Sequence, residues 1–362
     1  MSDYASLIPL NIVTGFLGSG KTTLLQRLLR SPRLANVAVL VNEFGEVGLD
    51  HQLLQSVTES TLLLDNGCIC CAIRGDLQDS LRDLLSQRAK GLIPAFDRVV
   101  VETSGLADPV PIAYTVMAEP VLQHHFRLGS IVTTVDAVNA AAQLSGYPES
   151  VKQVAVADRL IVTKTDLAEP AEADSLHAIL RRLNRSAPII QAASDGATAD
   201  NLLVDDIYDN EGKAREIAGW QESSAHDHGQ NDALAHEHAD AVHSFALTFD
   251  QPMDWTAFGI WLSMLLNRHG EHVLRVKGLL NLEGLATPVL INGVQHIVHP
   301  PSHLDAWPDA DRRSRLIFIV RGLDRERIEA SLDAFNRLAN PATTVPLRDA
   351  SQGAKSSRRG RL

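Results

Sequence analysis

The stretch GFLGSGKT, which begins at Gly15, matches the phosphate-loop pattern G-x-x-x-x-G-K-[ST] without a gap. Its glycines, including Gly18 and Gly20, let the backbone wrap phosphate groups closely, with N–H groups directed inward at a helix N-terminus. In such a loop Lys21 reaches the β- and γ-phosphates and the hydroxyl of Thr22 binds Mg²⁺. The stretch therefore predicts a site for a nucleoside triphosphate and Mg²⁺.

A second acidic element, ETSG, follows the apolar run RVVV directly. Glu102 stands where an acidic side chain can hold Mg²⁺ or its water, and Gly105 leaves room for a backbone N–H beside the γ-phosphate. No glutamine or histidine is evident in the sequence to orient an attacking water. We therefore expect slow intrinsic hydrolysis that depends on a metal or a partner for faster turnover.

The base is predicted from TKTD at residues 163–166. A carboxylate at Asp166 can accept two hydrogen bonds from guanine, whereas adenine offers no such pair of donors. The aliphatic stem of Lys164 can lie against the face of the base. Backbone groups of residues 192–194 are expected to add contacts, and GTP is favoured over ATP.

The three cysteines of the chain lie within NGCICC, as Cys68, Cys70 and Cys71. Adjacent cysteines form a disulfide only with strain, whereas clustered thiolates bind Zn²⁺, Cu⁺ or Co²⁺ well. Three sulfurs leave one tetrahedral position for water, a carboxylate such as Glu46, or a ligand from a receiving protein. A redox switch and an inert buried cluster are the alternatives.

Residues 216–243 are polar, acidic and rich in histidine, which predicts a flexible linker. Its His-x-His pairs can chelate Zn²⁺, Ni²⁺ or Co²⁺ loosely, although a linker that is histidine-rich by chance fits equally well. The candidate low-affinity ligands are His226, His228, His236 and His238.

Continuous apolar runs alternate with helical patterns over the first two hundred residues, which predicts an α/β phosphate-loop domain with a mostly parallel sheet. A smaller α+β domain follows, with strands interleaved with two helices. The expected strands of the first domain cover residues 10–13, 37–41, 61–64, 98–101, 130–135, 159–162 and 188–190. The expected divisions are a GTP-binding domain at 1–215, the linker at 216–243, the second domain at 244–343 and a disordered basic tail at 344–362.

Net charge and hydrophobic pattern argue against two classes of partner, nucleic acid and membrane. The formal net charge of -11 argues against nucleic acid, because binding phosphates requires a basic surface. No apolar run approaches the ~20 residues of a membrane span, and the N-terminus lacks the pattern of a signal peptide. We expect a cytoplasmic protein that binds neither nucleic acid nor membrane.

In their order and spacing, GFLGSGKTT, NEFGEVGLD, NGCICC, ETSGLADP and TKTD resemble the CobW-type GTPases, a family of metallochaperones and metal insertases related to the hydrogenase and urease nickel-handling GTPases. VLRVKGLLNL and GVQHIVH extend the resemblance into the second domain. It assigns the phosphate loop to residues 15–23, with Ser19 and Thr23 included, and guanine recognition to Thr163, Lys164 and Asp166. Some relatives carry a glutamate directly before NEFG, where this chain has Val41, so an accessory metal site there is in doubt.

The resemblance implies a GTP-hydrolysing metallochaperone that passes a metal, Zn²⁺ before Co²⁺ or Ni²⁺, to a client metalloprotein. GTP would order the thiolate site and hydrolysis would loosen it. A dedicated activator of a cobalt or nickel enzyme or of the corrin pathway, and a non-catalytic metal buffer or sensor, remain alternatives. A homodimer is left open.

Overall fold

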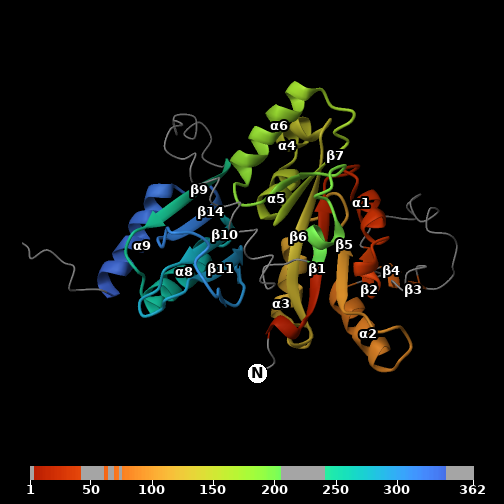
Figure 1. Cartoon of the computed structure of the whole chain (residues 1–362), viewed down its shortest axis with the longest axis horizontal. Coiled ribbons are helices and arrows are strands. Elements are labelled where there is room, and N and C mark those ends of the chain that lie inside the picture. The colour runs from red at the N-terminus through yellow and green to blue at the C-terminus, as the bar shows by residue number, and fades with distance from the viewer. Residues whose placement is uncertain (1–3, 42–60, 64–68, 73–75, 205–240, 340–362) are drawn as a thin grey trace, which may run out of the picture.

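The computed structural model describes residues 4–41, 61–63, 69–72, 76–204 and 241–339. These residues form two sheets that lie side by side, each with its own helices (Figure 1). The expected α/β domain and the smaller α+β domain are both confirmed.

The larger sheet has eight strands in the order β3-β4-β2-β5-β1-β6-β7-β8. Every neighbouring pair is parallel except β3 and β4, which run antiparallel. The strands are β1 (Ile8–Gly15), β2 (Val37–Val41), β3 (Thr61–Leu63), β4 (Ile69–Ala72), β5 (Arg98–Glu102), β6 (Phe126–Asp136), β7 (Arg159–Thr163) and β8 (Ile189–Gln191). The carboxyl ends of the parallel strands therefore share one edge, which is where such sheets bind ligands.

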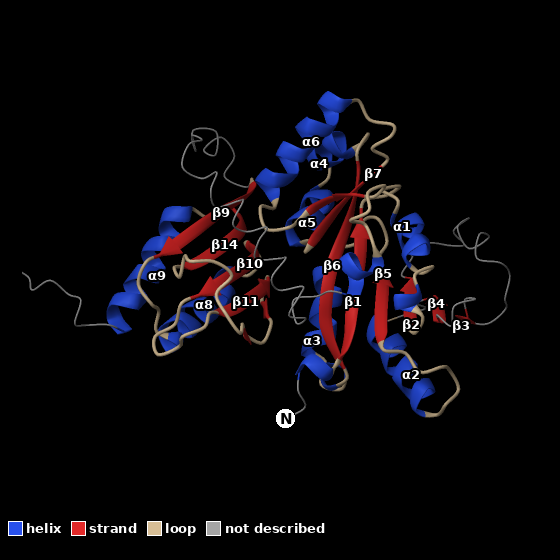
Figure 2. Cartoon of the chain, in the orientation of Figure 1, coloured by secondary structure: helices blue, strands red, loops and turns tan. Residues whose placement is uncertain are grey.

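Helices cover both faces of this sheet (Figure 2). Alternation along β5 shows how: Val99 and Val101 pack into one apolar cluster, while Val100 between them packs into another on the opposite face. Both faces are buried, as the continuous apolar runs predicted. The helices are α1 (Lys21–Leu28), α2 (Leu77–Ala89), α3 (Val110–Ala118), α4 (Ala140–Gly146), α5 (Pro148–Val156) and α6 (Pro170–Leu183), with a short π-helix η5 (Asp200–Val204).

The smaller sheet is antiparallel, in the order β12-β11-β10-β14-β9, with β13 paired to β11. One of its faces packs against α8 and α9 around Trp261 and Phe318. Its elements are β9 (Val242–Phe249), α8 (Trp255–His269), β10 (Val273–Leu280), β11 (Val289–Val294), β12 (Ile297–Val298), β13 (Ser302–His303), β14 (Ser314–Arg321) and α9 (Arg325–Ala339).

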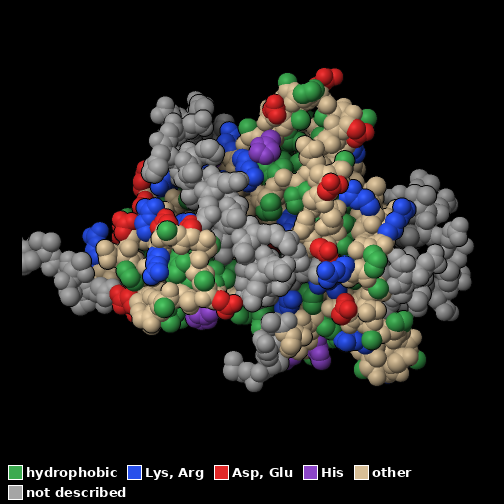
Figure 3. All heavy atoms as spheres, in the orientation of Figure 1, with side chains coloured by type: hydrophobic (Ala, Val, Ile, Leu, Met, Phe, Trp, Pro, Cys, Tyr) green, Lys and Arg blue, Asp and Glu red, His purple; other side chains and the backbone are tan. Residues whose placement is uncertain are grey.

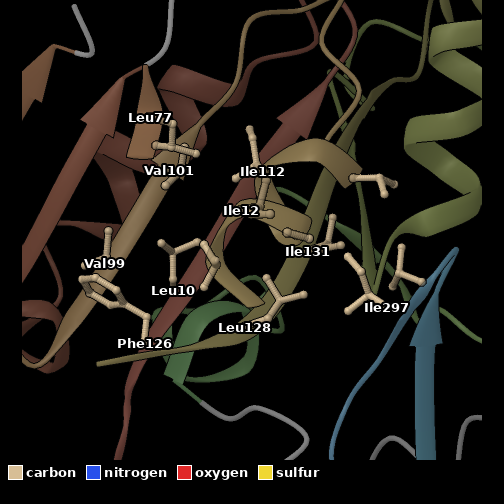
Figure 4. Close-up of a cluster of buried hydrophobic side chains, with 14 of the residues drawn as sticks. Leu10, Ile12, Leu77, Val99, Val101, Ile112, Phe126, Leu128, Ile131 and Ile297 are labelled. Atoms are coloured by element: carbon tan, nitrogen blue, oxygen red, sulfur yellow. The ribbon is translucent and has the colours of Figure 1, made fainter. Parts of the chain in front are cut away.

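The two domains share one hydrophobic cluster. Leu274, Ile297 and Ile319 of the second domain pack into the cluster that contains Ile12 and Ile131 of the larger sheet, and Ile297 approaches it in Figure 4. Helix α5 faces β10 across this contact. On the face of the molecule in Figure 3, acidic and basic side chains are intermingled.

Two details differ from the expected elements. Residues 69–72 form β4, which the sequence analysis did not predict, because it interpreted this part of NGCICC as a metal-binding motif. In the second domain, a turn at Gln295, with φ of 51°, separates β11 from β12. Strand β9 begins at Val242, inside the last two residues of the predicted linker.

Among the helices of the described residues, none is long and apolar enough to cross a membrane.

Candidate nucleotide site

The phosphate loop joins the end of β1 to the start of α1. Gly15, Gly18 and Gly20 have φ of 140°, 70° and 90°, a region that other residues rarely occupy. Gly15 has a second constraint, because a Cβ there would lie 2.3 Å from Oγ1 of Thr134 on β6. The glycines thus give a tight loop that leads its backbone N–H groups into the N-terminus of α1.

Lys21 folds over this loop. Its ammonium donates to the carbonyl oxygens of Gly15 at 3.0 Å and Phe16 at 3.1 Å, and the residue is buried. Ser19 is fixed beside it, since its Oγ lies 2.7 Å from Oγ1 of Thr134. The predicted phosphate-binding lysine therefore lies within the loop, where phosphate oxygens would bring their negative charge.

Thr22 and Glu102 come together although they are 80 residues apart in sequence. The hydroxyl of Thr22 donates to Oε1 of Glu102 at 2.5 Å, and Glu102 is buried at the carboxyl end of β5. A hydroxyl and a carboxylate are oxygen donors of the kind that Mg²⁺ prefers. The pair fits the Mg²⁺ position that the sequence predicts, because both oxygens lie beside the phosphate loop.

The ETSG segment lies against the phosphate loop. A Cβ on Gly105 would approach the backbone nitrogen of Leu17 to 2.6 Å, so only glycine fits there without movement. The hydroxyl of Thr103 donates to Oγ1 of Thr14 on β1 at 2.8 Å. These contacts place Gly105 where its backbone can approach a phosphate held by the loop.

TKTD begins at the carboxyl end of β7, as predicted. The hydroxyl of Thr163 donates to the carbonyl oxygen of Ser19 at 2.8 Å, which ties TKTD to the phosphate loop. Lys164 has a positive φ of 56°, rare for a residue with a side chain. Asp166 is exposed, so its carboxylate is accessible to a base. Thr23 is exposed on α1, one residue beyond Thr22.

Asp136 is a site residue that the sequence analysis missed. It ends β6, is 1% exposed, and accepts a 2.7 Å hydrogen bond from the ammonium of Lys164. Burial alone would raise the pKa of Asp136, but hydrogen bonds from Asn139, Lys164 and the Val138 amide outweigh burial and lower it. The available signal was an aspartate at the end of a buried strand, the same signal that singled out Glu102.

The segment after β8 is attached to the phosphate-loop helix. The guanidinium of Arg27 on α1 donates to the carbonyl oxygens of Ala192 and, at 3.1 Å, Ala197. Within this segment the hydroxyl of Ser194 donates to the carbonyl oxygen of Gln191 at 2.7 Å. The backbone of residues 192–194, predicted to contact the base, is thus held beside α1.

The predicted metal ligands fall mostly outside the described residues. Cys70 and Cys71 lie on β4, whose backbone pairs with Val39 and Leu40 of β2, but their side chains are outside what the structure describes. On its other side β2 pairs with β5, and that register places Val41 beside Glu102. Cys68, Glu46, His226, His228, His236 and His238 also lie outside the described residues.

A strand that leads through a glycine-rich loop into a helix, with a hydroxyl–carboxylate pair beside it, defines a phosphate-loop nucleotide-binding protein. A family model described as CobW/HypB/UreG, nucleotide-binding domain, matches residues 9–191. A second, described as the cobalamin synthesis protein cobW C-terminal domain, matches residues 242–336. The chain therefore belongs to the CobW/HypB/UreG family.

Similar proteins support this assignment. The chain is 34% identical to the zinc chaperone YjiA of Escherichia coli K12, over 90% of this chain and 97% of that protein. It is 28% identical to the zinc-regulated GTPase metalloprotein activator 1 of Schizosaccharomyces pombe, over 88% of this chain and 83% of that protein. The crystal structure of the Zn(II)-bound YjiA GTPase from E. coli superposes with a TM-score of 0.69 at 31% identity, over 91% of this chain and 99% of that chain.

Proposed function

We propose that the chain is a GTPase that binds Zn²⁺ and delivers it to a client metalloprotein in a nucleotide-dependent way. The observation that carries the proposal is the Thr22–Glu102 pair beside the phosphate loop, in a chain 34% identical to a zinc chaperone over nearly its whole length. Zinc is cargo in this proposal, and GTP hydrolysis controls its retention and release.

Thr22 and Glu102 would hold Mg²⁺, directly or through water. Bound Mg²⁺ would neutralise charge that develops on the β- and γ-phosphate oxygens. Lys21 would add positive charge on the loop side, while the N–H groups of the loop and of Gly105 would position the triphosphate. Apart from the nucleotide and Mg²⁺, every group required here belongs to the phosphate loop, the N-terminus of α1, the end of β5 or the ETSG segment that follows β5.

Guanine selection is assigned to TKTD. Asp166 would accept hydrogen bonds from guanine, and the stem of Lys164, held by Asp136, would cover one face of the base. Adenine would leave the carboxylate of Asp166 without its donors, so GTP would be preferred over ATP.

Cys68, Cys70 and Cys71 are proposed as the zinc ligands, with Glu46 or a client side chain as the fourth. Neutral thiols must lose protons to bind zinc, so affinity depends on the surroundings of the site. Linkage requires that any preference of the zinc-bound form for GTP be matched by an equal preference of the GTP-bound form for zinc. The histidines of residues 226–238 would supply weaker recruitment of metal.

The experiment is a competition titration of Zn²⁺ against a chromophoric chelator. It would be done with Mg²⁺ and a non-hydrolysable GTP analogue, then with GDP. We expect zinc binding at least about tenfold tighter with the GTP analogue, and loss of that difference when all three cysteines become serine. Equal zinc affinity in both nucleotide states would show that the nucleotide does not control the metal, and would reject delivery by this route.

A further inference from the structure

Helix α5 contacts both the ETSG loop and the second domain. The middle of the helix, at Lys152 and Gln153, contacts residues 105–108, and its C-terminal end faces β10. Gln153 and Val156 are only three residues apart, about 5 Å along a helix axis. A displacement of the C-terminal end of this short helix would therefore also move Gln153.

Gln153 fixes the ETSG loop. The residue is 1% exposed, and its amide group donates to the carbonyl oxygens of Gly105 at 3.2 Å and Ala107 at 3.0 Å. The backbone carbonyl of Gln153 accepts from the hydroxyl of Thr133 on β6 at 2.9 Å, which anchors the helix to the sheet. Next to it, the ammonium of Lys152 pairs with the carboxylate of Asp108. A buried side chain from α5 thus holds the carbonyl oxygen of Gly105 and restrains the backbone on either side of it.

The second domain holds the C-terminal end of α5. Arg275 of β10 is 1% exposed, and its guanidinium donates both to the carbonyl oxygen of Val156 and to the carboxylate of Asp158. Lys277, also 1% exposed, lies 3.1 Å from the same carboxylate. Asp158 in turn accepts a hydrogen bond from the backbone N–H of Ile131 on β6 at 2.9 Å.

The buried charges of Asp158, Arg275 and Lys277 restrict the contact between the two domains to a particular geometry. Burial alone would raise the pKa of Asp158, but the positive charges of Arg275 and Lys277 outweigh burial and hold it well below its usual value. A buried carboxylate between two buried cations is stable only when the three groups are aligned, because a displaced partner would leave a buried charge without its counter-charge. The second domain is therefore tied to α5 in a defined position.

We propose that Gln153 is a positioning residue for recognition of the γ-phosphate, and that Arg275 acts on the same loop from the second domain through α5. This inference rests on the proposed GTP site, in which the N–H of Gly105 lies beside the γ-phosphate. In that site the N–H of Gly105 would contact the γ-phosphate and no other part of the nucleotide. Loss of Gln153 therefore weakens binding of GTP but not of GDP. The position of the second domain changes the same quantity, the ratio of the affinities for GTP and GDP.

The test uses the full chain and measures the dissociation constants of a fluorescent non-hydrolysable GTP analogue and of fluorescent GDP, each with Mg²⁺. Gln153→Met keeps the length of the side chain and removes both hydrogen bonds to the loop. We expect the affinity for the GTP analogue to fall about tenfold, with GDP affinity changed by less than about twofold. The matched control is Gln143→Met on α4, the same chemical change on another helix, which should leave both constants unchanged.

Arg275 is tested in the same assay with two variants, because loss of a buried charge can prevent folding. Arg275→Met removes both contacts, whereas Arg275→Lys keeps the charge and cannot reach Val156 and Asp158 together. Both should lower the affinity for the GTP analogue about threefold relative to GDP, and the effect should shrink in the Gln153→Met background. Arg315→Met breaks an ion pair with Asp309 inside the second domain and serves as the control.

An unchanged ratio of the two affinities in folded Gln153→Met would overturn the role of Gln153. An unchanged ratio in Arg275→Lys, or full additivity of the two changes, would overturn the action of the second domain. Failure of the unmodified chain to bind either nucleotide is a different result, since it would refute the proposed GTP site itself.

Discussion

At the scale of single residues, the candidate nucleotide site depends on a few polar side chains and on glycines at positions where no side chain fits. Gly15 has both a positive φ and a contact that no Cβ tolerates, while Thr22 supplies one hydroxyl to a buried carboxylate. Each feature involves one residue and a few atoms around it. Single substitutions with matched controls therefore test them directly.

Gly15→Ala should abolish nucleotide binding and destabilise the fold. The new Cβ would lie 2.3 Å from Oγ1 and 2.4 Å from the backbone oxygen of Thr134, and φ of 140° is strained for alanine. We expect a loss of about 2 kcal/mol or more in the free energy of unfolding, measured by denaturant titration. Gly259→Ala on α8 has open space for its Cβ and should instead stabilise by ~1 kcal/mol. Normal GTP binding by Gly15→Ala would contradict the assigned loop geometry.

Thr22→Val removes the hydroxyl with little change in shape. We expect kcat for GTP hydrolysis to fall about a hundredfold or more, because the Mg²⁺ that the hydroxyl would help to hold is lost or displaced. Titration of activity against Mg²⁺ should show a higher requirement for the ion. Thr115→Val, which changes a threonine of α3 whose hydroxyl bonds only the carbonyl of Pro111 among the contacts described, is the control. An unchanged Mg²⁺ requirement would exclude Thr22 as a ligand.

At the scale of elements, the site is assembled from strand ends. β6 and β7 are adjacent and parallel, so Asp136 at the end of one lies beside Thr163 at the end of the other. The next residue, Lys164, turns back at a positive φ and places its ammonium 2.7 Å from Asp136. The proposed recognition of the base would thus depend on β6 and β7 ending at the same level.

Asp136→Asn tests this arrangement. The change removes the negative charge that holds Lys164, so the lysine stem should no longer be fixed beneath the base. We expect GTP to bind about tenfold more weakly and its preference over ATP to shrink, since part of the discrimination depends on an ordered base site. Asp174→Asn on α6, a carboxylate elsewhere on the surface of the same domain, is the control. A weaker affinity for both nucleotides with the preference intact would show a general loss of structure instead.

At the scale of the whole molecule, the two domains meet around buried charge. Asp158, Arg275 and Lys277 form the ionic centre, and His299, 2% exposed, lies near it. Burial lowers the pKa of His299 to about 4, with Asp158 opposing this effect and Arg275 and Lys277 adding to it. The folded protein therefore favours the neutral form of the His299 imidazole.

This shift predicts a pH dependence of stability. An unfolded histidine has a pKa of about 6.5, so between about pH 6.5 and pH 4 the unfolded state binds a proton that the folded state does not. The free energy of unfolding should therefore fall as the pH is lowered through this window, by up to ~3 kcal/mol from His299. Denaturant titrations at several pH values should give a shallower decline for His299→Asn than for the exposed control His303→Asn. Parallel curves for the two variants would exclude His299 as the source.

Local features of the site were predictable from sequence. The glycine pattern of GFLGSGKT fixes a loop because it meets a backbone requirement within eight residues, and continuous apolar runs indicate strands buried on both faces. Lys21, Thr22 and Glu102 were identified because their motifs place them directly at strand ends and at a helix start. Whether the predicted site residues bind nucleotide and metal stays a prediction that the experiments above address.

The contacts between distant segments were decided by the tertiary structure alone. Thr134 meets Ser19 across 115 residues, Gln153 meets Gly105 across 48, and Arg275 meets Asp158 across 117. Such partners follow from the order β5-β1-β6-β7 and from the placement of the second domain on α5. Hydrophobic periodicity specifies which face of a strand is buried but not which strand lies beside it. Arg275 and Lys277 therefore read as ordinary charged residues of a strand, until the first domain buries them against one carboxylate.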